Sequence, residues 1–308
     1  MDKEELYTFR WKLENDSDLY SGLSEGEHKF ILECISSRLS SPGVTSDAPS
    51  PNEASAAPLL NETSSDSLLD LVGDVDGDGD VDEDDLKVLF PKADYAKRKK
   101  WIKWARDAKT QRNRGPYRAN GGFPNGLIVH FTAGHPDESF SSRASAAAAS
   151  PYSYLFITDD GTLGQSNPLN QRGAHAGGEG INGFKPAHDY FIGVELSNPG
   201  KLKKVSSTMA KSWFPRRFPL DKCREVSSKD NVKGGIYYEY TDAQEETLFS
   251  LCLWLKWNDP KGFSFKNVVG HDEVAPRRKN DPGGALSCTM PEFREKLRAA
   301  WGELKKMA

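Results

Sequence analysis

The sequence predicts an α/β protein preceded by a small all-α module. From Gly126 onward, short apolar runs of strand length alternate with helical ones, the pattern of an α/β or α+β domain. The first 93 residues instead combine helical segments with one strongly acidic loop. With 308 residues, of which 37% are hydrophobic, the chain is long enough for one full-sized domain and a small appendage.

Composition divides the chain into four parts. Residues 1–39 are expected to be helical, because Ser24 and Glu27 form a capping box ahead of apolar residues at helical spacing. Residues 40–65, rich in Ser, Pro, Ala and Asn, have the composition of a flexible linker. Residues 66–93 are expected to form a helix, loop, helix unit, and residues 94–308 the main domain.

The loop of this unit has the spacing of an EF-hand calcium site. Such a loop places oxygen ligands at positions 1, 3, 5, 7, 9 and 12, with glycine at 6 and an aliphatic residue at 8. Gly79 and Val81 take positions 6 and 8. The six expected ligands are Asp74, Asp76, Asp78, the Asp80 carbonyl, Asp82 and Asp85.

Crowded carboxylates repel one another, so we expect this loop to bind a calcium ion that neutralises them. Position 12 is usually glutamate, but this chain has Asp85 there. An aspartate at this position resembles the calcium loops of dockerin-type repeats. An acidic turn without metal remains the alternative.

EF-hands usually pair, and residues 16–27 are a weak candidate for the partner loop. Asp16, Asp18 and Glu27 take ligand positions, but Tyr20 stands at position 5 and Ser21 replaces the turn glycine. The capping-box helix is the better interpretation of this segment, so no second calcium ion is expected.

In the main domain, the basic segment 94–114 is expected to be a helix. Strands are expected at 127–131, 154–158 and 191–196, where apolar, β-branched and aromatic residues run together. Helices are expected at 242–257 and 291–306.

Charge is distributed unevenly along the chain. The formal net charge is -4, yet residues 1–93 hold 22 acidic and 7 basic residues, and the remainder holds 23 acidic and 34 basic ones. A basic body suits an anionic polymer such as the bacterial cell wall, and nucleic acid equally well. Charge therefore indicates an anionic partner without identifying it. A basic surface that is merely solvated and binds no partner is the alternative interpretation.

Several classes are disfavoured. No stretch is long and apolar enough to span a membrane, and the N-terminus lacks the apolar core of a secretory signal, so we expect synthesis in the cytoplasm and release by another agent. The cysteines lie far apart without a Cys-x-x-Cys pair, which argues against a zinc ribbon or a disulfide scaffold. They are expected to be reduced: Cys34, Cys223, Cys252 and Cys288.

Three short motifs carry the residue types of a catalytic zinc site. His130 and Glu195 each follow an apolar run, and His271 opens a segment that contains Lys279 and Asp281. Two histidines and one carboxylate make a three-ligand zinc site whose fourth position is open for water. A histidine after an apolar run is more often a core residue, so spacing alone leaves both interpretations open.

Together, the motifs within residues 115–305 resemble the zinc N-acetylmuramoyl-L-alanine amidase family, which includes phage endolysin amidases, cytoplasmic recycling amidases and peptidoglycan-recognition proteins. The resemblance implies a central mixed β-sheet flanked by helices. Six landmarks carry it, in this order: Val-His130-Phe-Thr-Ala, Phe-Ile-Thr-Asp-Asp160-Gly161, Arg-Gly-Ala-His175-Ala-Gly, Ile-Gly-Val-Glu195-Leu, Tyr-Thr-Asp242-Ala-Gln244 and the segment from His271 to Gly283.

The resemblance implies a role for each site residue. His130, His271 and Asp281 would bind zinc, which activates a water molecule and polarises the amide carbonyl. Glu195 would be the general base, and Lys279 would stabilise the oxyanion. The lysine and the aspartate follow the second histidine by eight and ten residues, the register of the recycling-type branch.

The sequence departs from the phage branch of the family in two places. That branch has a cysteine ligand at the eighth position, and Cys288 lies too far along the chain to fill it. It also uses a tyrosine on the strand before Asp160, where this chain has Ser153. Tyr154 and His175 are expected to contact the substrate, with a structural role for the histidine as the alternative.

A third departure is an insertion of about 40 residues at 201–240, which contains Trp213 and Arg217. We expect this insertion to border the substrate groove and to shape access to cross-linked wall.

The leading hypothesis is a lytic, endolysin-type amidase that cuts the amide bond between N-acetylmuramic acid and L-alanine in peptidoglycan. The alternatives are a cytoplasmic recycling amidase acting on soluble anhydro-muropeptides, and a non-catalytic peptidoglycan-binding protein. The expected cofactors are a catalytic zinc ion and a structural or regulatory calcium ion. The expected partner is bacterial peptidoglycan, bound by a monomer without nucleic acid or membrane insertion.

Overall fold

The computed structural model describes residues 69, 71–73, 75, 80–108, 114–149 and 153–307. The N-terminal helices, the linker and the weak partner loop predicted within residues 1–65 lie outside this range. None of the described helices is both long enough and apolar enough to cross a membrane.

The main sheet is mixed, as expected, and it contains all three predicted strands. Its order is β1-β4-β3-β5-β2-β11, with β3 and β4 antiparallel and the other neighbours parallel. The strands are β1 (Arg106–Asp107), β2 (Gly126–Phe131), β3 (Leu155–Ile157), β4 (Leu163–Gln165), β5 (Phe191–Leu196) and β11 (Val268–Gly270).

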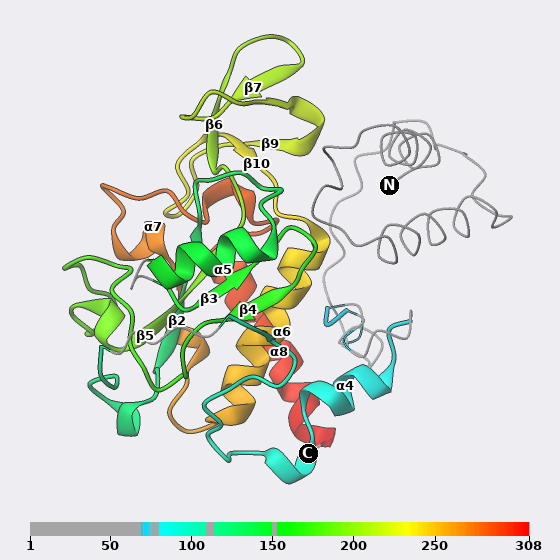
Figure 1. Cartoon of the computed structure of the whole chain (residues 1–308), viewed down its shortest axis with the longest axis vertical. Helices are drawn as coiled ribbons and strands as arrows, with labels where there is room; N and C mark the ends of the chain where they lie inside the picture. The colour runs from blue at the N-terminus through cyan, green and yellow to red at the C-terminus, as the bar shows by residue number, and fades with distance from the viewer. Residues whose placement is uncertain are drawn as a thin grey trace, which may run out of the picture. The chain divides into compact units, whose positions relative to one another are not determined.

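The two long predicted helices cover one face of this sheet. They are α6 (Asp242–Asn258) and α8 (Met290–Met307), which contact each other and pack on the strands (Figure 1). Leu127 and Val129 of β2 and Val194 of β5 point into the core beneath them. The opposite face of β2 and β5 carries a smaller cluster around Ile128, and the site residues occupy this face.

A capping box fixes where α6 begins. The Thr241 hydroxyl accepts a hydrogen bond from the Gln244 N–H, and the Gln244 side-chain oxygen accepts one from the Thr241 N–H, both at 3.1 Å. The Gln244 amide also donates to the carbonyl of Ser197, at 3.1 Å, just past the end of β5. This contact ties the start of the helix to the strand that carries Glu195.

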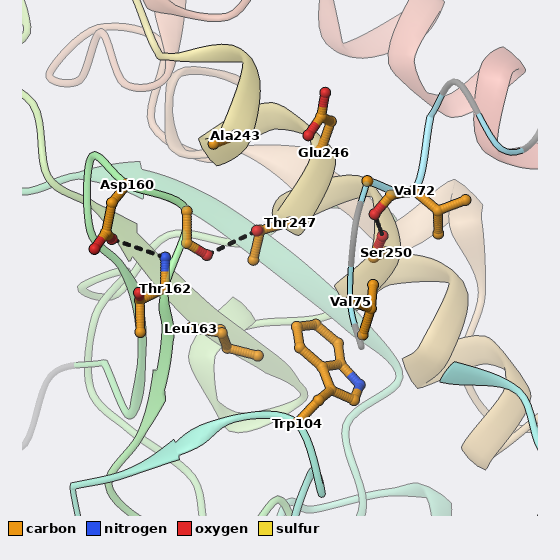
Figure 2. Close-up of a pocket in the computed structure, with 12 residues that line it drawn as sticks. Val72, Val75, Trp104, Asp160, Thr162, Leu163, Ala243, Glu246, Thr247 and Ser250 are labelled. Atoms are coloured by element: carbon orange, nitrogen blue, oxygen red, sulfur yellow. Dashed lines mark hydrogen bonds between the residues drawn. The ribbon is translucent and has the colours of Figure 1, made fainter. Parts of the chain in front are cut away.

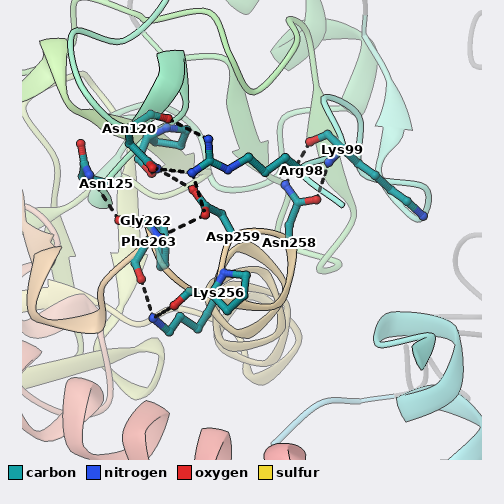
Figure 3. A network of polar contacts seen from close by, with 11 residues as sticks. Arg98, Lys99, Asn120, Asn125, Lys256, Asn258, Asp259, Gly262 and Phe263 are labelled. Carbon is teal, nitrogen blue, oxygen red and sulfur yellow. Dashed lines mark hydrogen bonds and ion pairs between the residues drawn. The ribbon is translucent and has the colours of Figure 1, made fainter. Parts of the chain in front are cut away.

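The prediction of a helix over 94–114 is wrong. The described residues form a 3-10 turn at Lys92–Asp94, then extended and turn backbone up to the short strand β1. Arg98 donates to the Asn120 side chain and pairs with Asp259, while Asn258 exchanges hydrogen bonds with the Lys99 backbone (Figure 3). These contacts hold the segment along the end of α6 in place of a helix of its own.

The insertion at 201–240 forms a second, antiparallel sheet, which the sequence did not predict. Its order is β8-β7-β6-β10-β9, and it extends beyond the main sheet at the top of Figure 1. The strands are β6 (Lys201–Lys204), β7 (Met209–Lys211), β8 (Arg217–Pro219), β9 (Cys223–Val226) and β10 (Gly235–Tyr238).

The shorter helices are α4 (Glu83–Leu89), α5 (Phe140–Ala149) and α7 (His271–Val274). Helix α4 is the second helix of the predicted calcium unit. Its Leu86 and Leu89 are buried in the same hydrophobic core as α6 and α8, together with Val72. The described part of the calcium unit therefore shares a core with the main domain.

Candidate metal centre and active site

The register of two central strands sets His130 beside Glu195. Strands β2 and β5 are parallel, and these two residues are direct partners in the pairing. Residues paired in this way point to the same side of a sheet, here the face away from α6 and α8. His130 is buried, and Glu195 is partly buried.

The next strand supplies the second histidine. Strand β11 pairs with β2 and ends at Gly270, and His271 opens α7 directly after it. A Cβ atom at Gly270 would lie 2.2 Å from an Asp272 carboxylate oxygen, so the tight turn requires glycine. The Asp272 N–H donates to the carbonyl of Asp281 at 2.8 Å, which brings the returning chain back beside His271.

Three side-chain atoms converge as a result. The Nδ1 atoms of His130 and His271 lie 2.9 Å apart, and the Oδ2 atom of Asp281 lies 3.0 Å from the first and 2.9 Å from the second. All three residues are buried. Hydrogen bonding alone does not require two imidazole nitrogens to face each other across one carboxylate oxygen, whereas a shared cation does.

The donor set fits zinc. Two imidazole nitrogens and one carboxylate oxygen are the ligands of many catalytic zinc sites, and a tetrahedral ion separates its ligand atoms by roughly 3.3 Å. The observed triangle is only slightly smaller, so small side-chain movements would admit the ion. The ligand set predicted from the sequence is thus brought together.

The protonation states also fit. Burial lowers the pKa of His130 to about 4, so its ring is neutral, as a metal ligand must be. Burial alone would raise the pKa of Asp281, but hydrogen bonds with His130 and His271 hold it well below its ordinary value. The site therefore combines a neutral imidazole at His130 with an ionised carboxylate at Asp281.

His175 lies behind His130, away from the ligand triangle. Its Nδ1 atom is 2.9 Å from Nε2 of His130, and its own Nε2 atom is 3.1 Å from the carbonyl oxygen of Phe191. A carbonyl can only accept, so His175 carries its proton on Nε2 and accepts from His130 through Nδ1. When a metal ion takes the place of the proton between Nδ1 of His130 and Asp281, this chain of bonds keeps the remaining ring proton of His130 on Nε2.

Gly193 makes room for this histidine pair. A Cβ atom at Gly193 would lie 2.8 Å from the His175 ring, so any larger residue on β5 would displace the imidazole. The predicted substrate contact by His175 does not fit this buried position, and the structural alternative does.

Glu195 borders a pocket of about 170 Å³ on the site face of the sheet. Burial raises the pKa of Glu195 to about 8, the negative charge of Asp281 adds to the increase, and the charges of Lys279 and Arg143 oppose it. The charge of Lys279 also acts on His130. Lys279, two residues before Asp281 in the sequence, therefore exerts its charge on both the predicted base and one of the proposed ligands.

Ser153 and Tyr154 occupy different environments. Ser153 lines the pocket beside Glu195, and its hydroxyl donates to the carbonyls of Leu155 and Gly193. Tyr154 is buried, at 2% exposure, near Tyr117. This position does not support a direct contact between Tyr154 and a substrate.

The cysteines take no part in the ligand triangle. Cys223, Cys252 and Cys288 are free thiols, in agreement with the expectation that they are reduced. Cys288 lines a different pocket, beside Glu245 and Phe293.

The calcium loop is described only in part, since Asp74, Asp76 and Asp78 lie outside the described residues. Asp82 caps α4 by accepting from the Asp84 N–H at 2.6 Å. The Asp85 carboxylate is 1% exposed and accepts from the N–H groups of Val75 and Asp82, at 2.5 and 2.9 Å.

A pocket of about 300 Å³ lies where this unit meets the main domain (Figure 2). The residues that line it include Val72, Val75, Trp104, Asp160 and Glu246. The carbonyl of Val72 accepts a hydrogen bond from Ser250 of α6 at 3.1 Å, so the loop is attached to the same helix that supports β5. None of the predicted zinc-site residues lines this pocket.

Three supporting residues were missed at the sequence level. Tyr240 donates to the carbonyl of His130 at 3.3 Å, Gln244 braces the end of β5, and Arg143 lines the pocket beside Glu195. Tyr240 and Gln244 belonged to a landmark motif, but their contacts depend on tertiary structure. Arg143 stands in a stretch of serine and alanine whose pattern carries no functional signal.

The comparison with known families agrees with this geometry. Residues 120–284, which include the whole ligand triangle and Glu195, match the N-acetylmuramoyl-L-alanine amidase family. The chain belongs to that family.

Curated relatives of this amidase-family chain are 1,6-anhydro-N-acetylmuramyl-L-alanine amidases named AmpD. The one from Salmonella typhimurium SL1344 is 28% identical over 141 residues, which is 46% of this chain and 54% of the relative. The one from Escherichia coli K12 is 28% identical over 133 residues, 43% of this chain and 52% of the relative. The chain thus spans about half the length of the curated relatives it matches.

Solved structures of amidases also align with the chain. A selenomethionine derivative of AmpD aligns at 21% identity and a TM-score of 0.40, covering 64% of this chain and 96% of that one. AmiD from Escherichia coli, in complex with anhydro-N-acetylmuramic acid-L-Ala-D-γ-Glu-L-Lys, aligns at 22% identity and a TM-score of 0.37, covering 55% and 56%.

Proposed function

We propose that this chain hydrolyses the amide bond between N-acetylmuramic acid and L-alanine in bacterial peptidoglycan. The proposal depends on one observation above all, the convergence of His130, His271 and Asp281 beside a partly buried Glu195. Family membership and the names of the curated relatives support the choice of bond.

In this proposal His130, His271 and Asp281 hold a zinc ion. When bound, zinc lowers the pKa of a water molecule towards neutrality and polarises the scissile carbonyl. Glu195 takes the proton of the attacking water and returns it to the leaving L-alanine nitrogen. A carboxyl group whose pKa is already raised by burial is suited to carry a proton between these two steps.

Lys279 stabilises the negative charge that develops on the carbonyl oxygen during the attack. It is half-buried, and its charge acts on Glu195 and on His130, so it is close to the reacting atoms. A fixed positive charge there favours the transition state over the neutral substrate.

The catalytic assignment is tested by Glu195→Gln, which removes the base and keeps the shape. We expect kcat on soluble muropeptide to fall about 10²–10⁴-fold while the zinc content stays at one ion per chain. Glu239→Gln is the matched control, since Glu239 is a partly buried glutamate outside the pocket beside Glu195. A Glu195→Gln enzyme as active as the control would refute the assignment.

We propose the intact wall as the substrate, in a lytic, endolysin-type role after release from the cell that makes the protein. The basic main domain and the additional N-terminal segment support this choice. The second candidate is a recycling role on soluble anhydro-muropeptides, favoured by the names of the curated relatives and by the spacing of Lys279 and Asp281 after His271. Comparing kcat/KM on purified sacculi and on anhydro-muropeptide separates the two roles.

We propose further that Asp74, Asp76, Asp78, Asp80, Asp82 and Asp85 bind one calcium ion. The spacing of the loop supports this assignment. Because α4 shares the core of the main domain, the ion would stabilise the fold and leave the zinc chemistry unchanged.

A further inference from the structure

The second sheet has one apolar face, and its strands β6, β7 and β8 carry basic side chains on the other face. Leu202, Ala210, Phe218 and Ile236 form its buried cluster. Between Lys201 and Arg224 the sequence has eight basic residues and one acidic one. Charge in this part of the insertion is therefore strongly one-sided.

Three of the basic side chains form a row across β6, β7 and β8. Lys203 is the direct pairing partner of Lys211, and Lys211 is the direct partner of Arg217. The neighbouring pair, Ala210 and Phe218, points into the buried cluster, so the basic row points to the opposite, solvent side. All three side chains are exposed, and adjacent strands lie about 4.8 Å apart, so the row spans roughly 10 Å.

Nothing in the described part of the chain neutralises this row. None of its three members forms an ion pair with a described residue, although neighbouring Arg216 and Arg224 both do. Like charges directly opposite each other destabilise a sheet. Negative charges on an anionic partner would offset the repulsion among these three side chains and would explain why the sheet keeps them side by side.

Trp213 stands at the tip of the β7–β8 hairpin, two residues after Lys211. Its side chain is 78% exposed, the most exposed large hydrophobic side chain of the described residues. Its Nε1 atom donates to the carbonyl of Ala133 at 2.7 Å, so the ring is held in place while its surface stays open to solvent. Large exposed apolar side chains often mark binding surfaces.

The hairpin tip is fixed to the loop that follows the first zinc-site histidine. Ala133 comes three residues after His130. Arg216 forms a bidentate ion pair with Asp137 in the same loop, at 2.6 and 2.9 Å, and its Nη1 atom lies 2.8 Å from Nδ1 of His135. Trp213 and two members of the row, Lys211 and Arg217, therefore belong to a hairpin that is attached to the loop after β2, the strand that carries His130.

From these contacts we infer that Lys203, Lys211, Arg217 and Trp213 form a docking surface for polymeric peptidoglycan, next to the catalytic site. The inference rests on the proposed function and specifies its substrate class. The three charges attract the free carboxylates of the stem peptides. The indole packs against the C–H face of a sugar ring, which an aromatic surface with a fixed orientation favours. A surface beside the site adds affinity only for a substrate long enough to reach both.

The test uses the full chain and sacculi stripped of all other wall polymers. In the triple variant Lys203→Gln/Lys211→Gln/Arg217→Gln, we expect binding to sacculi in a co-sedimentation assay to weaken about tenfold and to lose most of its salt dependence. In Trp213→Ala we expect weaker binding with unchanged salt dependence. Hydrolysis of a soluble muropeptide should stay within about twofold of the parent for both, which also reports an intact fold.

The matched control is Lys261→Gln/Lys266→Gln/Lys305→Gln, which removes the same charge from exposed lysines outside the second sheet. Equal weakening by the control and the row variant would overturn the inference, as would unchanged binding in the row variant. So would an equal loss of soluble-fragment hydrolysis, which would indicate damage to the fold or the site. Since the row is self-repelling, its removal should leave the melting temperature unchanged or higher.

Two further outcomes are distinct from these. Tighter binding to duplex DNA than to sacculi, lost in the row variant, would overturn the peptidoglycan assignment in favour of nucleic acid. If the parent cleaves neither sacculi nor soluble muropeptide, the proposed function fails, while the binding comparison still decides whether the surface docks the polymer.

Discussion

His130 uses both ring nitrogens, one towards the ligand triangle and one towards His175. The second contact continues to the Phe191 carbonyl, so the tautomer of His130 is set by a backbone atom two contacts away. The sequence indicated which residues belong to the site, but not which of them orients a metal ligand. His175 was recognised as part of a motif, and its placement behind His130 could not be derived from spacing.

The first residue-scale prediction concerns zinc affinity. Replacing His175 with alanine removes the acceptor that orients His130, so we expect zinc to bind about 10–100-fold more weakly. Competition with a chelator of known affinity measures this directly, without an activity assay. His188→Ala is the control, because His188 is near His175 but contacts none of the three proposed ligands. Equal zinc affinity in the two variants would contradict the role of His175 in orienting His130.

The second concerns stability and pH in the metal-free protein. Burial raises the pKa of Glu195 from 4.5 to about 8, so the folded state holds this proton more tightly than the unfolded chain does. Its contribution to stability is full below about pH 4.5 and is lost as the pH rises through about 8. Because glutamine does not titrate, we expect the free energy of unfolding of Glu195→Gln to fall less than that of the parent as the pH rises from about 4.5 to about 8.

Urea denaturation of chelator-treated protein at several pH values measures this difference. Parallel profiles for parent and Glu195→Gln would show that the carboxyl is not held in its neutral form. Added zinc should reduce the difference, because a nearby dication favours the carboxylate.

At the scale of elements, the sequence predicted what has strong local patterning. β2, β3 and β5 are apolar runs, and α6 has a Thr241–Gln244 capping box, so their types and positions follow from local rules. The segment 94–108 is composed like a helix but is held extended by contacts with Asn258 and Asp259, which lie more than 150 residues away. Such long-range contacts are invisible to periodicity.

The calcium unit gives a prediction at this scale. Because α4 contributes Leu86 and Leu89 to the main core, we expect Asp74→Ala and Asp78→Ala to lower the melting temperature in calcium. An ion at 100 times its dissociation constant contributes about 2.7 kcal/mol to folding. Asp84→Ala is the control, since Asp84 is exposed and stands outside the ligand positions. Identical calcium-dependent melting in all three variants would contradict a calcium site.

Considered as a whole, the chain combines a site on one face of a mixed sheet with a basic second sheet next to it. The chemistry of the first was predictable because six short motifs resemble those of a known amidase family, whereas spacing alone left the roles of the histidines open. The second was predicted only as an insertion, since its strands are three or four residues long and carry little alternation. Its basic row exists only once Lys203, Lys211 and Arg217 are brought into register.

In the proposed reaction, zinc held by His130, His271 and Asp281 supports cleavage of the bond to L-alanine. The most direct measurement is to digest purified sacculi with zinc-loaded protein and to identify the new amino termini by mass spectrometry. We predict stem peptides with free L-alanine amino groups and uncut glycan strands, a release that stops with chelator, resumes with zinc and is absent in His271→Ala. New sugar reducing ends without L-alanine termini, or equal release by His271→Ala, would contradict the account.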